Sequence, residues 1–266
     1  MSIYQSLAQL EAAGQPAALC TIVASQGSTP RHEGSKMLVY PDGRTEGSVG
    51  GGELESLVVE AARAALSDGQ PRKVDFSMVD PQRGDPGVCG GSVSVFVEPI
   101  VPAPTMVVIG AGHVGRAVAH LAKWLGFRVV VSDDRAAFCT PEAVPGADQY
   151  LPCPMVDLPL HISITPHHYL ILTTRNVMVD VPGLPALLET PAAYLGIIGS
   201  KRRWLTTREK LQEAGIPEEK LNRVVSPIGL ALKAETPEEI AVSILGEIIM
   251  LRRGGDGKRM GHLVPD

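Results

Sequence analysis

Residues 107–115 read Val-Val-Ile-Gly-Ala-Gly-His-Val-Gly, an apolar strand that runs directly into the pattern G-x-G-x-x-G. In a dinucleotide-binding fold the first glycine permits a tight turn and the second lets backbone approach a pyrophosphate. The third lets the next helix pack on the sheet. Gly110, Gly112 and Gly115 stand at these three positions. The stretch therefore predicts a strand–turn–helix unit that binds a nucleotide.

The surrounding sequence favours a Rossmann-like fold. Short apolar strands, expected at 106–109, 128–132, 169–173 and 194–198, alternate with helix-length segments. This alternation is typical of parallel strands joined by crossover helices. The last helix is expected to begin at Thr236, which forms a capping box with Glu239, and to end near Arg253. We predict a Rossmann-like domain over residues 106–255, followed by a weakly ordered tail, 256–266.

Two residues after the second strand bear on the choice of nucleotide. Asp133 is expected to accept hydrogen bonds from a ribose diol, which favours NAD over NADP, whereas Arg135 is placed to engage a 2′-phosphate. His113, inside the glycine turn, is expected to face the ligand or to be structural rather than to act as a general acid. No Tyr-x-x-x-Lys pattern occurs, so the proton-donor pair of short-chain dehydrogenases is missing.

The first hundred residues follow another pattern. Ser2 and Gln5 are spaced as a capping box for an amphipathic helix over 2–14. Strands are expected at 18–24, 36–40, 73–77 and 92–97, with a helix at 53–67. This pattern predicts a small N-terminal α/β domain over residues 1–100. The prolines that follow indicate a linker at 101–105.

The composition argues against several classes of protein. The 266 residues carry a formal charge of −5 and only 4% aromatic side chains, whereas nucleic-acid-binding proteins are usually basic and use aromatic stacking. Every long apolar stretch is broken by proline or charge, and the start lacks a leader pattern, so a cytoplasmic protein without membrane contact is expected. The four cysteines form no CxxC pair, which predicts reduced thiols.

Several further motifs, dispersed over both halves, occur together with the glycine pattern. They are 27–31 (GSTPR), 47–55 (GSVGGGELE), 89–93 (CGGSV), 110–115 (GAGHVG), 194–202 (YLGIIGSKR), 227–230 (PIGL) and 234–241 (AETPEEIA). In content and order they resemble the XdhC/CoxI family of xanthine dehydrogenase accessory proteins. Several motifs matching at once are far more specific than G-x-G-x-x-G alone.

This resemblance implies a two-domain, usually dimeric protein that binds the molybdenum cofactor, molybdopterin. Such a protein shelters the cofactor while a cysteine desulfurase partner supports installation of the terminal sulfur, and then passes it to an apo-molybdenum hydroxylase. It implies binding and hand-over by a chaperone without turnover of its own, so no catalytic residue is expected. NAD(P) remains a second candidate ligand of the Rossmann-like half.

Candidate binding residues follow from the motifs. The N–H groups of Gly50–Gly52, which open a helix, are expected to point outward unpaired. Arg175 and Lys201 follow apolar strands, where ligands of open α/β sheets gather, whereas Arg203 is expected to be a solvated surface charge. The full cofactor-binding set is Gly110, Gly112, His113, Gly115, Asp133, Ser48, Gly50, Gly51, Gly52, Glu53, Arg31, Cys89, Gly90, Arg175, Ser200 and Lys201.

Cys89 stands apart from the other cysteines because it lies in a loop rich in Pro and Gly. It is the predicted metal ligand, since a thiolate there would contact molybdenum or receive sulfur. The alternative is a small residue that packs a tight turn.

Two positions depart from the family pattern. Glu53 stands where relatives often carry Cys or His, and residues 175–180 keep Asp180 but lack the usual histidines. A different client, or cofactor binding without sulfuration, would follow from these differences. Two other functions stay open. One is an NAD(P)-dependent oxidoreductase acting on a small substrate, and the other is a nucleotide-sensing regulatory module, which leaves the motifs of residues 25–92 unexplained.

Overall fold

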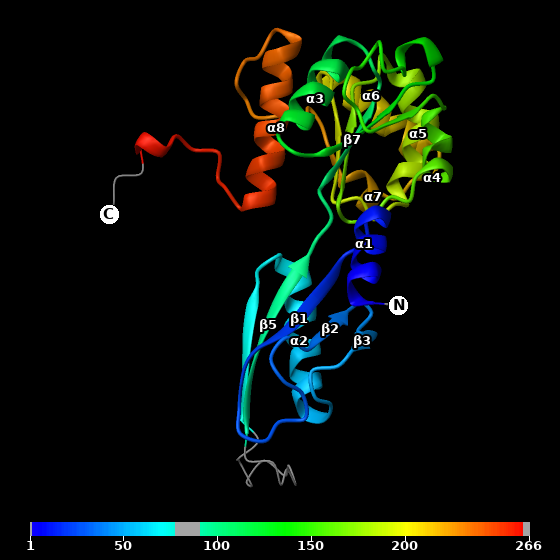
Figure 1. Ribbon diagram of the computed structural model, residues 1–266. Coiled ribbons are helices and arrows are strands. Elements are labelled where there is room, and N and C mark those ends of the chain that lie inside the picture. The colour runs from blue at the N-terminus through cyan, green and yellow to red at the C-terminus, as the bar shows by residue number, and fades with distance from the viewer. Residues whose placement is uncertain (1, 78–90, 263–266) are drawn as a thin grey trace. The chain divides into compact units, whose positions relative to one another are not determined.

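The computed structural model describes residues 2–77 and 91–262 of the chain, which divides into two compact units, 1–102 and 103–266 (Figure 1). Cys89 and Gly90, and the roles predicted for them, lie outside the described residues. Among the described helices, none is long and apolar enough to cross a membrane.

The first unit begins with helix α1 (Ile3–Ala13). The Ser2 hydroxyl accepts a hydrogen bond from the Gln5 N–H, and the Gln5 side chain accepts one from the Ser2 N–H, which confirms the predicted capping box. The helix ends at Gly14, whose φ of 63° is readily adopted by glycine.

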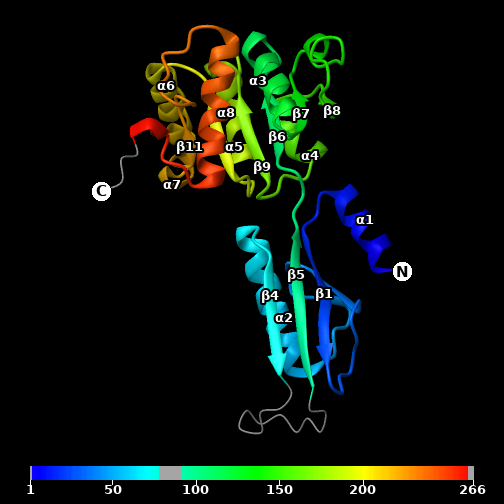
Figure 2. The same ribbon diagram turned by 60° about the vertical axis from the view of Figure 1, so that its left-hand side comes forward.

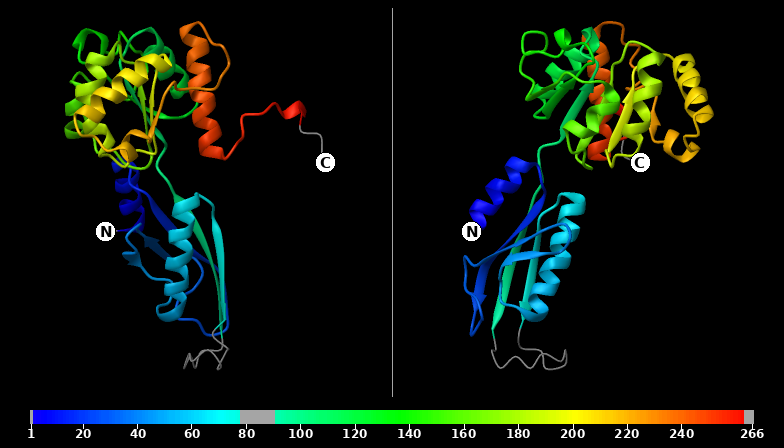
Figure 3. Two further views of the ribbon diagram at one scale, coloured as in Figure 1. Left: turned by 180° about the vertical axis from the view of Figure 1, so that it is seen from behind. Right: turned by 90° about the vertical axis from the view of Figure 1, so that its right-hand side faces the viewer.

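The core of the first unit is an antiparallel sheet covered by helix α2 (Gly52–Asp68) (Figure 3). Its strands, in the order β3-β2-β1-β5-β4, are β1 (Ala17–Gln26), β2 (Lys36–Val39), β3 (Thr45–Gly47), β4 (Arg72–Ser77) and β5 (Ser92–Ile100). Alternate residues of β1, Ala18, Cys20 and Ile22, are buried in one cluster with Val58 and Ala62 of α2. The period of two along the strand therefore directs one face of the sheet towards the helix.

The second unit is built on a parallel sheet, as the sequence predicts, with six strands where four were expected (Figure 2). The strands are β6 (Thr105–Ile109), β7 (Arg128–Ser132), β8 (Gln149–Leu151), β9 (His168–Leu172), β10 (Tyr194–Ile197) and β11 (Val224–Val225). Their order in space is β11-β10-β9-β6-β7-β8, the doubly wound order of dinucleotide-binding domains. The winding direction reverses between β6 and β9, so the carboxyl ends of these two strands mark the topological switch point.

Helices cover both faces of this sheet. On one face, α3 (His113–Trp124) and α8 (Pro237–Arg253) pack against Met106 and Val108 of β6. On the other face, α5 (Val177–Leu188) and α6 (Lys201–Glu213) pack against Val107 and Ile109. The short helices α4 (Leu158–His161) and α7 (Glu218–Leu221) complete the unit. Because β6 is buried on both faces, its residues 106–109 are all apolar.

The capping residues of α8 follow the sequence prediction. Thr236 and Glu239 form a reciprocal capping box, Pro237 occupies the first turn, and Gly254 ends the helix in the left-handed conformation. This long, well-capped helix lies beside α3 and covers the side of the sheet opposite α5 and α6.

Candidate functional site

A cavity of about 600 Å³ lies at the carboxyl edge of the parallel sheet, at the switch point. Loops that follow four neighbouring strands line it. They contribute Gly110, Gly112 and His113 after β6, Asp133, Asp134 and Arg135 after β7, Thr173, Thr174 and Arg175 after β9, and Gly199 and Arg203 after β10. Ligands of open α/β sheets bind at this edge.

The three glycines of the turn after β6 have different physical roles. Gly110 has a φ of 107°, and a Cβ there would lie 2.7 Å from the Thr173 carbonyl oxygen. A Cβ on Gly115 would collide with the Gly110 carbonyl oxygen. A Cβ on Gly112, in contrast, would meet no atom within 4 Å. Gly110 and Gly115 are therefore required by packing, whereas Gly112 leaves open space in the cavity that a ligand can fill.

Helix α3 directs its N-terminus into this open space. Gly112 is its cap and His113 its first residue, and both line the cavity. Among residues 2–77 and 91–262, no group accepts a hydrogen bond from the N–H of Gly112 or His113. Free N–H groups and the helix dipole make such a terminus favourable for a phosphate group. The residues present therefore fit a phosphate-bearing ligand.

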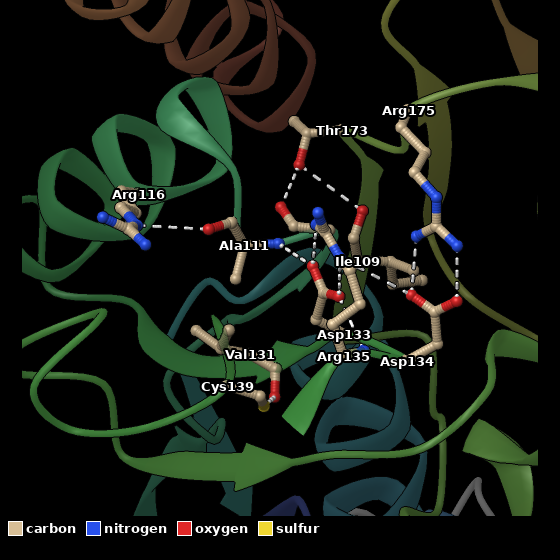
Figure 4. Close-up of polar contacts among 11 residues, drawn as sticks. Ile109, Ala111, Arg116, Val131, Asp133, Asp134, Arg135, Cys139, Thr173 and Arg175 are labelled. Atoms are coloured by element: carbon tan, nitrogen blue, oxygen red, sulfur yellow. Dashed lines mark hydrogen bonds and ion pairs between the residues drawn. The ribbon is translucent and has the colours of Figure 1, made fainter. Parts of the chain in front are cut away.

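Asp133 is occupied by the chain itself (Figure 4). Its Oδ2 accepts from the Ala111 N–H at 2.8 Å and from Arg135 Nη2 at 2.9 Å. Its Oδ1 accepts from the backbone N–H and Nε of Arg135, both at 2.9 Å. A carboxylate offers about four acceptor positions, and all four are used here. The ribose-binding role of Asp133 stays a prediction that requires Arg135 to move.

Asp134 and Arg175 join the loops after β7 and β9 across the cavity (Figure 4). The guanidinium donates from Nη1 and Nη2 to the two carboxylate oxygens, both at 2.7 Å. Both side chains are partly exposed, Asp134 at 33% and Arg175 at 43%. The hydrogen bonds and positive charge of Arg175 lower the pKa of Asp134 to about 2, so the pair is ionised at neutral pH.

Arg203 forms a buried ion pair, and its predicted role as a solvated surface charge was wrong. Its Nη2 lies 2.6 Å from Asp180, whose side chain is fully buried, and only 19% of the Arg203 side chain is exposed. The guanidinium also donates to the carbonyl and hydroxyl oxygens of Thr174 at 2.9 and 2.7 Å. Ser200 caps α6 by accepting from the Arg203 N–H, which places Arg203 in the first turn of this helix, and the Arg203 side chain lines the cavity.

The other predicted residues of the second unit separate into two groups. His113 and Arg175 line the cavity, as does Asp133. Lys201 is exposed at the start of α6 and, like Ser200, is not among the residues that line the cavity. The glycine turn and Arg175 therefore line the same cavity, whereas Lys201 lies outside it.

In the first unit, the Glu55 side chain accepts hydrogen bonds from the glycine loop. Glu55 Oε1 accepts from the Ser48 hydroxyl at 2.6 Å and from the N–H groups of Val49 and Gly51 at 3.2 and 3.1 Å. The Gly50 N–H donates to the Ser48 hydroxyl. The expectation that these N–H groups are unpaired was therefore wrong for Gly50 and Gly51, because a carboxylate one helical turn into α2 folds back over them.

The ionisation of Glu55 reflects this arrangement. Burial acts to raise the pKa of Glu55, but the hydrogen bonds from Ser48 and the backbone of Gly51, Val49 and Gly50 together outweigh it and lower the pKa. Of the remaining predicted residues in this unit, Arg31, Gly52 and Glu53 are exposed.

Several residues of the cavity were not predicted from the sequence. They are Asp134, Thr174, Phe138, Cys153 and Met155. Phe138 carries the Arg135 guanidinium 3.9 Å above its ring centre. Cys153 is buried and, like Cys20 and Cys139, a free thiol, as predicted. Burial raises the pKa of Cys153. No cluster of three His, Cys, Asp or Glu residues suited to a metal ion occurs in the described part of the chain.

The fold and the site define a two-unit protein with a Rossmann domain whose cavity fits a phosphate-bearing ligand. Comparison with known families gives the relationship. Residues 106–248 match the XdhC Rossmann domain, and residues 10–77 match the XdhC and CoxI family. The chain therefore belongs to the XdhC and CoxI family, which confirms the predicted resemblance.

Individual relatives agree with this assignment. The chain is 37% identical over 264 residues to the uncharacterized protein YqeB of Escherichia coli K12, covering 98% of this chain and 48% of YqeB. It is 33% identical over 162 residues to a protein of Bacillus subtilis named as a probable xanthine dehydrogenase component, covering 61% of this chain and 47% of that protein. The chain thus spans about half the length of these two relatives.

Two further similarities extend over most of both chains. The molybdenum cofactor insertion chaperone PaoD of Escherichia coli K12 is 24% identical, covering 90% of this chain and 84% of PaoD. A crystal structure described as a xanthine dehydrogenase from Bacillus halodurans superposes with a TM-score of 0.51 at 25% identity, covering 100% of this chain and 98% of that chain.

Proposed function

We propose that this chain is an accessory protein that binds the molybdenum cofactor and supports its insertion into a xanthine dehydrogenase-type hydroxylase. Membership of the XdhC and CoxI family supports this role, as do the names of PaoD and of the Bacillus subtilis relative. The observation that carries the proposal is the cavity at the switch point, with open space at Gly112 and the N-terminus of α3 directed into it.

The residues of the cavity account for binding in physical terms. Molybdopterin carries a phosphate group, which the free N–H groups of Gly112 and His113 would hold. Arg175 would supply positive charge at the same edge, and the buried Asp180–Arg203 pair would keep the loops around the ligand in place. When bound, the cofactor supplies the redox chemistry of the client enzyme, while this chain orients the cofactor and shields it from water.

Sulfuration and assembly form the finer part of the proposal. A cysteine desulfurase would provide the terminal sulfur while the cofactor is held here, and the working unit would be a homodimer in the cytoplasm. Cys89 stays the predicted sulfur acceptor and molybdenum ligand, outside the described residues.

An NAD(P)-dependent oxidoreductase is the second candidate, and the doubly wound strand order favours it. The internal hydrogen bonds of Asp133 weigh against it, because the expected ribose acceptor has no free position. A change in nicotinamide absorbance on mixing the chain with NAD(P)H and small carbonyl substrates would favour this alternative.

The proposal is tested by purifying the full chain from a host that makes the molybdenum cofactor and from one that cannot. Oxidation of the bound material and measurement of pterin fluorescence is expected to give signal only from the first host. The loaded chain is then mixed with an apo-hydroxylase, and the hydroxylase is expected to gain activity. Absence of pterin from the first preparation, under conditions where PaoD retains it, would overturn the proposal.

A further inference from the structure

The three arginines of the cavity differ in how firmly the chain holds them. Arg135 and Arg203 pair with Asp133 and Asp180, whose side chains are 2% and 0% exposed. Both acids also accept hydrogen bonds from other groups of the chain, the Ala111 N–H and the Thr174 hydroxyl respectively. Removing either arginine from its acid would leave a buried, uncompensated charge, which is strongly unfavourable. Separating either pair is therefore more costly than separating an exposed ion pair.

The Asp134–Arg175 pair lacks this restraint. Asp134 is one-third exposed and its Oδ1 lies 3.9 Å from Arg135 Nε, so water and Arg135 can compensate its carboxylate once Arg175 leaves. Exposed ion pairs contribute little stability. Only one donor of each terminal guanidinium nitrogen is engaged by Asp134, and the Arg175 Nε makes no hydrogen bond within the described residues. Arg175 is therefore the cavity arginine that a ligand can recruit at low cost.

The space around the pair allows this exchange. Asp134 and Arg175 line the main cavity and also a neighbouring cavity of about 300 Å³, together with Met155 and Val179. Their side chains therefore have open volume on two sides. The N-terminus of α3 lines the main cavity as well, so a phosphate group there would lie in the same chamber as Arg175.

We propose that Arg175 is an exchangeable anion clamp and that Asp134 is its resident counter-ion, which the phosphate or diphosphate group of an incoming ligand displaces. This inference rests on the proposed function, because the ligand in question is the phosphate-bearing cofactor. Asp134 then sets affinity by competing for Arg175. A direct contact between Asp134 and ligand hydroxyls would have the opposite effect, since loss of the carboxylate would weaken binding.

The test measures binding of inorganic pyrophosphate to the full chain by calorimetry. The Asp134→Asn variant is expected to bind about two- to fivefold more tightly, because an exposed ion pair no longer competes for Arg175. Arg175→Ala is expected to bind at least about tenfold more weakly, as for loss of a charge-assisted pair of hydrogen bonds. In Arg175→Ala, adding Asp134→Asn is expected to give a smaller gain than in the wild type.

A matched control is Asp148→Asn. Asp148 is also 33% exposed and pairs with a cation, Lys123, but it lies at the amino edge of the same sheet, where it accepts from the Val129 N–H. The net charge changes equally, so an equal gain in Asp148→Asn would show a general charge effect and overturn the proposal. Three other results would overturn it as well. These are an equal gain in affinity from Asp134→Asn with and without Arg175, weaker binding by Asp134→Asn, and a wild type that does not bind pyrophosphate.

Pterin retention separates this inference from the proposed function. If the wild type retains pterin but the affinity for pyrophosphate does not change in the Asp134 and Arg175 variants, the clamp proposal is wrong and the proposed function still holds. If pyrophosphate binding follows the expected pattern but no pterin is retained, the clamp stands and the cofactor assignment is wrong.

Discussion

The two glycine loops of this chain look alike in sequence but differ in the structure. Both place glycines at the start of a helix, Gly50–Gly52 at the start of α2, and Gly110 and Gly112 just before α3. In the first unit, the Glu55 carboxylate folds back and accepts hydrogen bonds from the N–H groups of Val49 and Gly51. In the second, Asp133 accepts from only one N–H of the loop, that of Ala111, while Gly112 and His113, whose N–H groups donate to no described residue, line the cavity. The glycine pattern alone therefore does not identify an anion site, because a carboxylate of the chain can already accept from the loop N–H groups.

The largest expected effect tests which glycines of the second loop serve packing. Gly115→Ala should destabilise the chain by about 5 kcal/mol or more, because the new Cβ would overlap the Gly110 carbonyl oxygen. Gly112→Ala should cost no more than about 1 kcal/mol, the effect of a poorer helix cap. Urea unfolding of both variants checks this. Equal losses would show that Gly112 is also a packing residue and would remove the distinction.

The next effect compares two of the three arginines that line the cavity, Arg203 and Arg175. Arg203→Ala should cost about 3–5 kcal/mol, because it leaves Asp180 buried without a counter-ion. Arg175→Ala should cost less than about 1 kcal/mol, because its pair with Asp134 is exposed to solvent. Denaturant midpoints measure both changes. A large loss in Arg175→Ala would show that the Asp134–Arg175 pair is a fixed part of the fold.

The smallest effect concerns Glu55 and the glycine loop of the first unit that donates to it. The pKa of Glu55 is lowered in the folded chain, so its ionised form adds stability that is fully present above the ordinary pKa of about 4.5 and is lost as the pH falls through the folded value. Glu55→Gln should cost about 1–2 kcal/mol at neutral pH, and the difference from wild type should shrink below pH 4.5. Thermal unfolding across pH measures it. A difference independent of pH would mean that the carboxylate charge does not hold the loop.

Much of the fold could be predicted because its signals are local. The apolar run of β6, the glycines after it and the capping box of Thr236 and Glu239 each act within a few residues. Other elements lack such a signal. Strand β11 has only two residues, and α5 contains Pro182 and Pro185, which usually end helices.

The site was less predictable, because its chemistry depends on pairs that are distant in sequence. Asp134 lies 41 residues from Arg175 and Asp180 lies 23 from Arg203. A single sequence does not show these pairings. A signal for Arg203 was present, however: Ser200 is a good helix cap, which places Arg203 in the first turn of α6. Glu55 could be found by the same reasoning, as an acid in the first turn after a glycine loop.

The central claim is that the cofactor binds in the cavity of the second unit, at the glycine turn after β6. Pterin content per chain, measured after purification from a host that makes the cofactor, tests it in Gly112→Ala and in Ser48→Ala, whose hydroxyl serves Glu55 in the first unit. We predict a fall of at least about tenfold in Gly112→Ala, as for one excess methyl group in a fitted pocket, and wild-type content in Ser48→Ala. Loss of pterin in Ser48→Ala with full retention in Gly112→Ala would contradict the account.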